Sequence, residues 1–184
     1  WTGSPERRGT VTMLIVATPS RTDIQAYAKL ERDVLEKIER LNDEFRTLDW
    51  TPIVLVHENV DADLLAAVYC AADVCVVSSL QDGMNLVAKE FIACRTDRNG
   101  VLVLSRFAGA SDELGAALLV NPFFIDAFAD TLAVALDMPR HERVERMTIL
   151  RDRVANATID DWLDAILSAA EATDQAAEGG AATL

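Results

Sequence analysis

The sequence VCVVSSLQDGMNLVAKEFIACR, residues 74–95, places a short apolar run, a polar loop and a helical pattern in succession. Val74–Ser78 is rich in β-branched residues, which predicts a buried strand. Asn85–Arg95 has the periodicity of a helix, and Asn85 suits the start of that helix. In the loop, Gly83 lets the main chain approach a ligand or adopt a positive φ. A strand followed by a loop and a helix is the repeating unit of α/β folds.

The same succession extends along the chain on both sides of this segment. Apolar runs predict further strands at Thr10–Ala17, Pro52–His57, Val101–Ser105 and Ala117–Val120. Helical patterns cover residues 24–45, the stretch that begins at Asp61, and residues 126–136, 141–154 and 159–170. The predicted fold class is therefore α/β, with a doubly wound, Rossmann-like parallel sheet over residues 1–170. The small, polar residues 171–184 predict a disordered tail.

The composition limits the classes of function. The 184 residues carry 17 Lys and Arg against 30 Asp and Glu, which gives a net charge of −13. That length favours a single domain, and the negative charge argues against nucleic acid or an anionic membrane as a partner. No apolar run approaches the roughly 18–20 residues that a membrane span needs.

The cysteines and histidines do not predict a metal site. Cys70, Cys75 and Cys94 have no CxxC spacing, and each lies in an apolar run, which predicts buried, reduced thiols in a cytoplasmic protein. His57 and His141 are too far apart to complete a zinc site with them. The sequence also lacks the GxGxxG, GxxxxGK[ST] and GxSxG patterns of dinucleotide turns, P-loops and hydrolase elbows.

The loop of residues 79–90 has the chemistry of an anion site. Ligands of doubly wound sheets bind at the carboxyl ends of the strands, where this loop is expected. The amides of Met84–Val87 would fall in the first helical turn, where amides lack partners within the helix and can bind a diphosphate. Asp82 could meet a sugar, and Glu90 could accept hydrogen bonds from the vicinal hydroxyls of a ribose. The alternative is that Asp82 and Gly83 form a plain turn, that Asn85 caps the helix and that Glu90 is only solvated.

Five stretches then carry a resemblance: PSRTD (19–23), LDWTP (48–52), LQDGMNLVAKEF (80–91), VLVLSRFAGASDEL (101–114) and ALLVNP (117–122). Together they resemble the C-terminal, donor-binding half of trehalose-6-phosphate synthases. These are retaining glycosyltransferases of family 20, with the two-domain GT-B architecture. The resemblance runs over residues 5–165, and DGMNLVAKE is its most specific part.

The resemblance implies a hexosyltransferase that moves glucose from UDP-glucose to glucose 6-phosphate with retention, giving α,α-trehalose 6-phosphate and UDP. The acceptor hydroxyl attacks on the side of the leaving group, and a phosphate oxygen takes its proton. Neither a metal ion nor a cofactor is implied. A cytoplasmic location is expected, with no nucleic acid or membrane as partner, and a full-length protein able to form a homo-oligomer.

The resemblance also implies roles for individual residues. Asp82 matches the catalytic-site aspartate that contacts the transferred glucose, and Glu90 matches the residue that holds the ribose hydroxyls. Arg21 matches the arginine on the acceptor's phosphate, and Val60 matches a position whose backbone contacts the uracil. The donor site predicted in this way comprises Val60, Asp82, Gly83, Met84, Asn85, Leu86, Val87, Ala88, Lys89 and Glu90.

Two departures from the family pattern accompany the match. Gln81 stands where an arginine is usual, which removes one local positive charge. Three further parts of the family pattern match no segment of this sequence: the other acceptor residues, the arginine and lysine that clamp the donor, and the first strand of the domain. The chain alone is therefore expected to be inactive. Two alternatives stay open: a stand-alone nucleotide-sugar-binding or regulatory module, and a related synthase such as glucosylglycerol-phosphate synthase.

Overall fold

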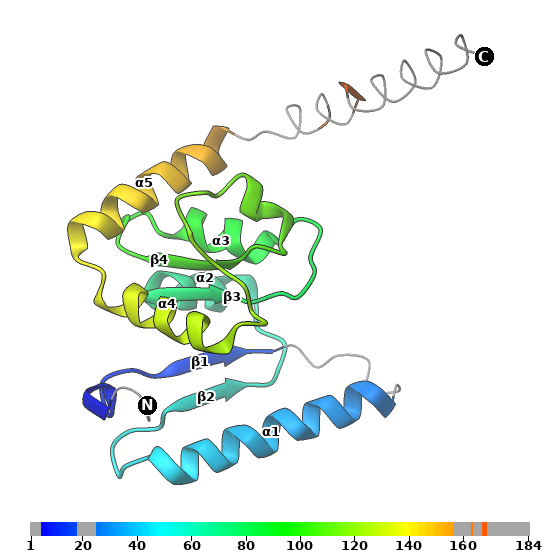
Figure 1. Cartoon of the computed structure of the whole chain (residues 1–184), viewed down its shortest axis with the longest axis vertical. Helices are drawn as coiled ribbons and strands as arrows, with labels where there is room; N and C mark the ends of the chain where they lie inside the picture. Colours follow the sequence, from blue (N-terminus) through cyan, green and yellow to red (C-terminus); the bar gives the residue numbers. More distant parts are fainter. Residues whose placement is uncertain (1–4, 18–24, 157–162, 164–166, 169–184) are drawn as a thin grey trace. The chain divides into compact units, whose positions relative to one another are not determined.

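The computed structural model describes residues 5–17, 25–156, 163 and 167–168, and its elements are labelled in Figure 1. Arg21, the predicted tail at 171–184 and most of the predicted helix at 159–170 lie outside these residues. The chain divides into two compact units, Trp1–Leu65 and Ala66–Leu184. Among the described helices, none is long and apolar enough to cross a membrane.

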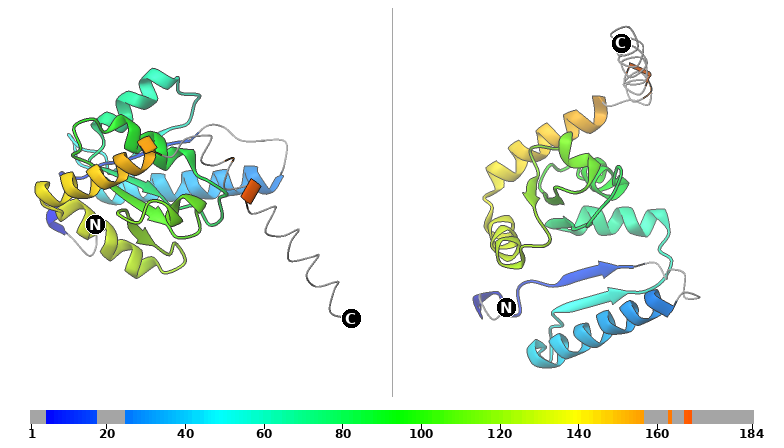
Figure 2. Two further views of the ribbon diagram at one scale, coloured as in Figure 1. Left: turned by 90° about the horizontal axis from the view of Figure 1, so that it is seen from above. Right: turned by 45° about the vertical axis from the view of Figure 1, so that its right-hand side comes forward.

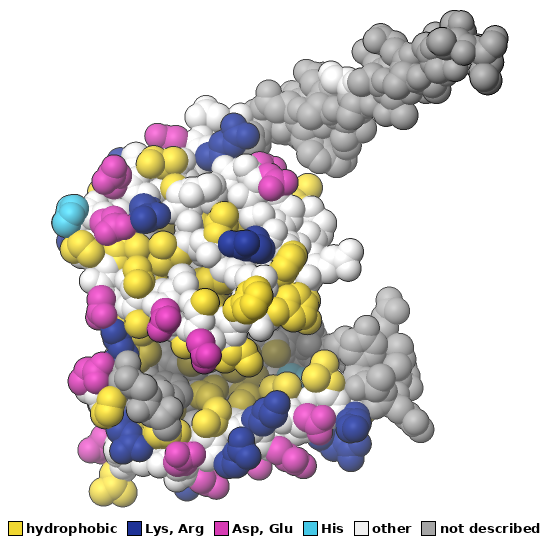
Figure 3. Space-filling model, in the orientation of Figure 1, with side chains coloured by type: hydrophobic (Ala, Val, Ile, Leu, Met, Phe, Trp, Pro, Cys, Tyr) yellow, Lys and Arg dark blue, Asp and Glu magenta, His cyan; other side chains and the backbone are white. Residues whose placement is uncertain are grey.

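The first unit contains a two-stranded parallel sheet and one long helix. After a short 3-10 turn, η1 (Pro5–Arg7), β1 (Met13–Val16) pairs with β2 (Ile53–Val56), and α1 (Gln25–Phe45) connects them. The side-chain amide of Asn42 on α1 donates to the carbonyl of Ile53 at 2.9 Å and accepts from its N–H at 3.0 Å. These two bonds fix α1 to the start of β2. The outward face of α1 carries interspersed acidic and basic side chains (Figure 3).

The second unit is a three-stranded parallel sheet of order β3-β4-β5. Its strands are β3 (Val74–Val77), β4 (Val101–Ser105) and β5 (Leu118–Val120). The helices are α3 (Leu86–Cys94), α4 (Ile125–Asp137) and α5 (Arg140–Asn156), with a 3-10 turn η2 (Gly109–Asp112); α2 (Ala62–Ala71) spans the boundary with the first unit. Figure 2 shows the helices of this unit from two further sides.

The central strand β4 is covered on both faces, which explains its uninterrupted apolar sequence. All five of its residues are buried. Because side chains alternate along a strand, Val101 and Val103 face one way and pack with Ala135 and Met138 of the α4 region. Leu102 and Leu104 face the other way, where α3 and α5 contact β4. This arrangement confirms the predicted doubly wound α/β class.

The structure differs from the sequence-based expectation in two respects. The strands form two parallel sheets, β1-β2 and β3-β4-β5, not one. Among the described strands, the parallel pairings join β1 to β2 and join β4 to both β3 and β5, and no recorded pairing links the two sheets. In addition, Cys70 is exposed, so the prediction of burial is wrong for this cysteine, which lies in the last turn of α2.

Candidate functional site

Main-chain hydrogen bonds connect the loop between β3 and α3 to the loop after β4. The N–H of Asp82 donates to the carbonyl of Phe107 at 3.2 Å, and that of Gly109 donates to the carbonyl of Asp82 at 3.0 Å. The N–H of Ala110 donates to the carbonyl of Met84 at 3.0 Å. Both loops follow the carboxyl ends of adjacent parallel strands, which is where ligands of doubly wound sheets bind.

Gly109 permits this contact because it has no Cβ atom, which lets its backbone lie very close to that of Gly83. A Cβ atom on Gly109 would lie 2.1 Å from the carbonyl oxygen of Gly83, well inside van der Waals contact. A Cβ atom on Gly83 would meet nothing within 4 Å. The sequence suggested two reasons for a glycine at position 83: a positive φ or the close approach of a ligand. Gly83 has no positive φ, so the approach of a ligand is the reason that remains. The glycine that the loop pairing itself requires is Gly109, which the sequence had not singled out.

The carboxylate of Asp82 organises the loop. Its Oδ1 accepts hydrogen bonds from the N–H groups of Met84 (3.3 Å) and Asn85 (3.1 Å). Its Oδ2 accepts one from the Asn85 side-chain amide at 2.8 Å and one from the Ser79 hydroxyl at 3.5 Å. A carboxylate has about four lone-pair sites, so protein groups occupy all of them here. A sugar hydroxyl that binds Asp82 would replace the long contact to Ser79.

Asn85 starts α3 from a left-handed backbone conformation. Its φ is 67° and its ψ is 85°, a region that asparagine tolerates better than most residues. The side-chain oxygen accepts a hydrogen bond from the N–H of Ala88 at 2.9 Å, which caps the helix as predicted. The same side chain therefore holds Asp82 on one side and the helix on the other.

These contacts leave two amides of the first turn of α3 open. The N–H groups of Met84 and Asn85 donate to Asp82, and that of Ala88 donates to Asn85. Within the described residues, no acceptor is recorded for the amides of Leu86 and Val87. Their side chains are 59% and 44% exposed, so solvent reaches this end of the helix. The helix dipole adds partial positive charge at the same place.

Glu90 and Lys89 lie one turn further along α3. The carboxylate of Glu90 is exposed and accepts a hydrogen bond from the Tyr69 hydroxyl at 3.1 Å. The ammonium of Lys89 pairs with Glu113 at 3.0 Å, which ties α3 to the end of the second loop. Gln81 is exposed. The described residues contain no group of three or more His, Cys, Asp and Glu side chains arranged to hold a metal ion.

Two residues of the predicted site are not brought to this loop by any described contact. Arg21 lies outside the described residues. Val60 is partly buried in the segment between β2 and α2 and belongs to the other unit. Nearby, Nε2 of His57 lies 3.1 Å from a carboxylate oxygen of Glu31, and both side chains are partly buried.

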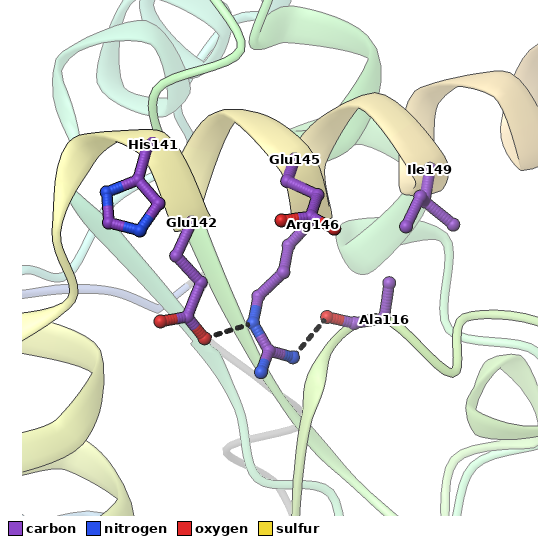
Figure 4. A pocket seen from close by; sticks show the side chains of 6 residues that line it. All are labelled: Ala116, His141, Glu142, Glu145, Arg146 and Ile149. Carbon is purple, nitrogen blue, oxygen red and sulfur yellow. Dashed lines mark hydrogen bonds and ion pairs between the residues drawn. The ribbon is translucent and has the colours of Figure 1, made fainter.

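An open hollow of about 440 Å³ lies elsewhere, between α5 and Ala116 (Figure 4). The guanidinium of Arg146, which lines the hollow, donates to the Glu142 carboxylate at 2.8 Å and to the carbonyl of Ala116 at 3.2 Å. His141, Glu145 and Ile149 complete the lining. The hollow shares no residue with the loop of residues 79–90, and Nε and Nη1 of Arg146 already donate to protein groups.

The pKa of Asp82 is predicted to lie below its ordinary value of 3.8, because the Asn85 side-chain amide and the two backbone N–H groups favour the charged form. The stability that this carboxylate contributes is then fully present above about pH 4 and is lost as the pH falls through the lowered pKa. A carbon-13 NMR titration of the Asp82 carboxyl measures this value. Asn85→Ala should raise it, whereas Asn121→Ala should not, because the recorded hydrogen bond of the Asn121 side chain is to the N–H of Phe123 and not to Asp82. A midpoint at or above 3.8 in the unmodified chain would contradict the prediction.

Comparison with solved structures identifies the class of protein to which this fold belongs. The fold is that of part of a GT-B glycosyltransferase. A solved UDP-forming α,α-trehalose-phosphate synthase from Burkholderia xenovorans, in complex with glucose-6-phosphate, aligns with a TM-score of 0.86 and 41% identity over 91% of this chain and 37% of that one. A trehalose-6-phosphate structure from E. coli, bound with UDP-2-fluoro glucose, aligns with a TM-score of 0.84 and 38% identity over 89% of this chain and 37% of that one.

The family follows from the sequence match. The model of glycosyltransferase family 20 matches residues 2–172, and the chain belongs to this family. The trehalose-6-phosphate synthase of Cronobacter sakazakii is 42% identical over 164 residues, which are 89% of this chain and 35% of that protein. The chain thus spans about a third of the length of such relatives.

Proposed function

We propose that this chain provides the donor-binding half of an α,α-trehalose-phosphate synthase, which transfers glucose from UDP-glucose to glucose 6-phosphate with retention. Membership of family 20 supports the reaction class. Solved relatives bound to glucose-6-phosphate and to UDP-2-fluoro glucose support the substrates. The observation that carries the proposal is the pair of open amides, Leu86 and Val87, at the start of α3.

The amides of Leu86 and Val87 would hold the diphosphate of the sugar nucleotide. Each hydrogen bond to a charged group contributes about 1.5–3 kcal/mol, more than the helix dipole at an exposed position. An anion bound there also avoids the desolvation of a cationic side chain. Because Asp82 lies beside these amides, the glucose of the donor would meet its carboxylate, while Glu90 would accept the ribose hydroxyls one turn later.

The reaction needs groups beyond this loop. In the proposed front-face reaction, the anomeric hydroxyl of the acceptor forms the new bond to the glucose C1 as the bond from C1 to the diphosphate oxygen breaks. A phosphate oxygen of the departing UDP takes the hydroxyl's proton. Arg21 is proposed on the acceptor's phosphate and the backbone of Val60 on the uracil. A cytoplasmic location and self-association of the full-length protein stay predictions.

Calorimetry tests the donor site in the 184-residue chain. We expect UDP to bind with a dissociation constant of roughly 0.1–1 mM, which corresponds to about 4–5.5 kcal/mol, and uridine to bind at least about tenfold more weakly because it has no phosphate for the amides. Equal binding of UDP and uridine, or no binding of UDP by the folded chain, would contradict the proposal.

A second measurement separates donor binding from turnover. The chain mixed with UDP-glucose and glucose 6-phosphate is expected to form no trehalose 6-phosphate, because most of the acceptor site is assigned to parts of the family pattern that this sequence does not match. Detectable product would show that the acceptor site lies within these 184 residues. The same assay on the full-length parent protein should give product and serves as the positive control.

A further inference from the structure

The carboxylate of Glu90 has one hydrogen bond recorded among the described residues. The hydroxyl of Tyr69, in the last turn of α2, donates to Oε2 of Glu90 at 3.1 Å. A carboxylate only accepts hydrogen bonds, so the direction of this bond is settled. Oε1 and the remaining lone pair of Oε2 stay available to a ligand. Two acceptor sites on one fixed carboxylate suit a pair of vicinal hydroxyls.

The Tyr69 hydroxyl is itself held in place from two sides. Its ring is 9% exposed and lies edge-on to the fully buried Phe91, with centroids 6.3 Å apart and an interplanar angle of 73°. The end of α2 is fixed by the guanidinium of Arg95, which donates to the carbonyls of Tyr69 at 3.3 Å and Cys70 at 2.6 Å. A mobile Glu90 would lose side-chain entropy when it bound a ligand, and a fixed partner reduces that loss.

The Tyr69 hydroxyl also keeps its proton. Burial and the hydrogen bond to Glu90 raise the pKa of this phenol well above its ordinary value of 10.0. It therefore stays a hydrogen-bond donor throughout the physiological range. The contact needs no change of protonation when a ligand arrives or leaves.

We propose that Tyr69 is a positioning residue that orients the Glu90 carboxylate toward the two ribose hydroxyls of the sugar nucleotide. The inference rests on the proposed function, in which Glu90 binds the ribose. It adds a residue on a different helix that never touches the ligand and acts only through Glu90. Its specific consequence is that Tyr69 contributes to the discrimination between ribose and a sugar without these hydroxyls.

The test measures that discrimination by calorimetry with two probes, UDP and 2′,3′-dideoxy-UDP. The unmodified chain should bind UDP about 10–100-fold more tightly than the dideoxy compound. Glu90→Gln should bring the ratio close to 1. Tyr69→Phe should lower the ratio about 3–10-fold and leave the affinity for dideoxy-UDP unchanged. The double variant should discriminate no less than Glu90→Gln alone.

Two controls separate positioning from folding. Tyr69→Phe keeps the ring that packs on Phe91, and its thermal midpoint shows whether the fold is retained. Cys70→Ser changes the next residue, which is exposed and whose thiol donates to the carbonyl of Cys94, and should keep the full ratio. A structural loss alone would weaken both probes equally in Tyr69→Phe, which would overturn the inference.

The outcomes also separate the inference from the proposed function. If Glu90→Gln abolishes the discrimination and Tyr69→Phe leaves it intact, the role of Tyr69 is wrong and the ribose assignment survives. If neither variant changes the ratio, the ribose assignment of Glu90 fails, and the inference fails with it.

Discussion

Arg95→Met is expected to lower the free energy of unfolding by about 3–5 kcal/mol, in the range seen when a buried charge network loses one partner. The Arg95 side chain is 4% exposed, and its guanidinium donates to the carbonyls of Tyr69, Cys70 and Ala72 at the end of α2. It also bonds to Asp97 at 2.9 Å and to the carbonyl of Asn99. Methionine fills the space of the aliphatic part of the arginine but leaves these acceptors without their donor. Each acceptor left without a hydrogen bond costs about 1–3 kcal/mol of stability, and water that reaches it reduces this cost.

Urea unfolding of the whole chain measures this loss. Arg153→Met, at an exposed arginine in the last turn of α5, makes the same change of charge and volume and should stay within about 0.5 kcal/mol of the unmodified chain. A loss below about 1 kcal/mol in Arg95→Met would mean that the guanidinium does not hold α2 and α3 together as described.

Gly109→Ala is expected to cost about 1–3 kcal/mol of stability, as overpacking of a close contact does, and to weaken UDP binding at least about tenfold. The new methyl group would lie 2.1 Å from the carbonyl oxygen of Gly83, and that oxygen belongs to the backbone and cannot rotate away. The loop of residues 79–85 must therefore move from its partner loop. This movement shifts Asp82 and the start of α3, where the ligand is expected.

Two other glycines provide matched controls. A methyl group on Gly115 meets nothing within 4 Å, so Gly115→Ala should leave both stability and UDP binding unchanged. Gly83→Val should fold normally because the space at its Cβ is empty, yet abolish UDP binding because the side chain occupies the ligand's approach. Normal UDP binding in Gly109→Ala would contradict the loop pairing, and normal binding in Gly83→Val would contradict the approach of the ligand.

Local sequence patterns predicted the elements well. The strand at Val101–Ser105 is as predicted, and the helix expected at Asn85–Arg95 is observed at Leu86–Cys94, with Asn85 and Arg95 as its caps. Both predictions rest on information within a few residues: a continuous apolar run for a strand buried on both faces, and a side chain that can cap the next turn. The first strand is shorter than expected, Met13–Val16 within Thr10–Ala17, because the parallel register with β2 covers these four residues.

The contacts that organise the site depend on residues far apart in the sequence. Arg95 bonds to carbonyls 23–26 residues earlier, and Tyr69 reaches Glu90 across 21 residues. No periodicity marks such pairs, since they arise only when α2 and α3 pack together. The close approach of Gly109 to Gly83 is likewise a property of two loops, and the composition of either loop alone does not identify it.

Sequence spacing also could not show which amides of the loop bond within the protein and which are open to a ligand. The residue types of Asp82 and Asn85 allowed a plain turn, a helix cap or a ligand site. The structure shows that both side chains accept hydrogen bonds from the surrounding backbone, which restricts the open amides of the first turn to Leu86 and Val87. The sequence therefore predicted this loop as the candidate site but could not determine which of its main-chain donors are available.

The most direct test follows these two amides by proton–nitrogen NMR in the isotope-labelled chain. On addition of UDP or inorganic pyrophosphate, the amide protons of Leu86 and Val87 are predicted to move downfield together and to saturate with the same dissociation constant, while uridine leaves them in place. Unmoved Leu86 and Val87 signals in the presence of bound UDP, or equal shifts with uridine, would contradict a diphosphate held by the start of α3.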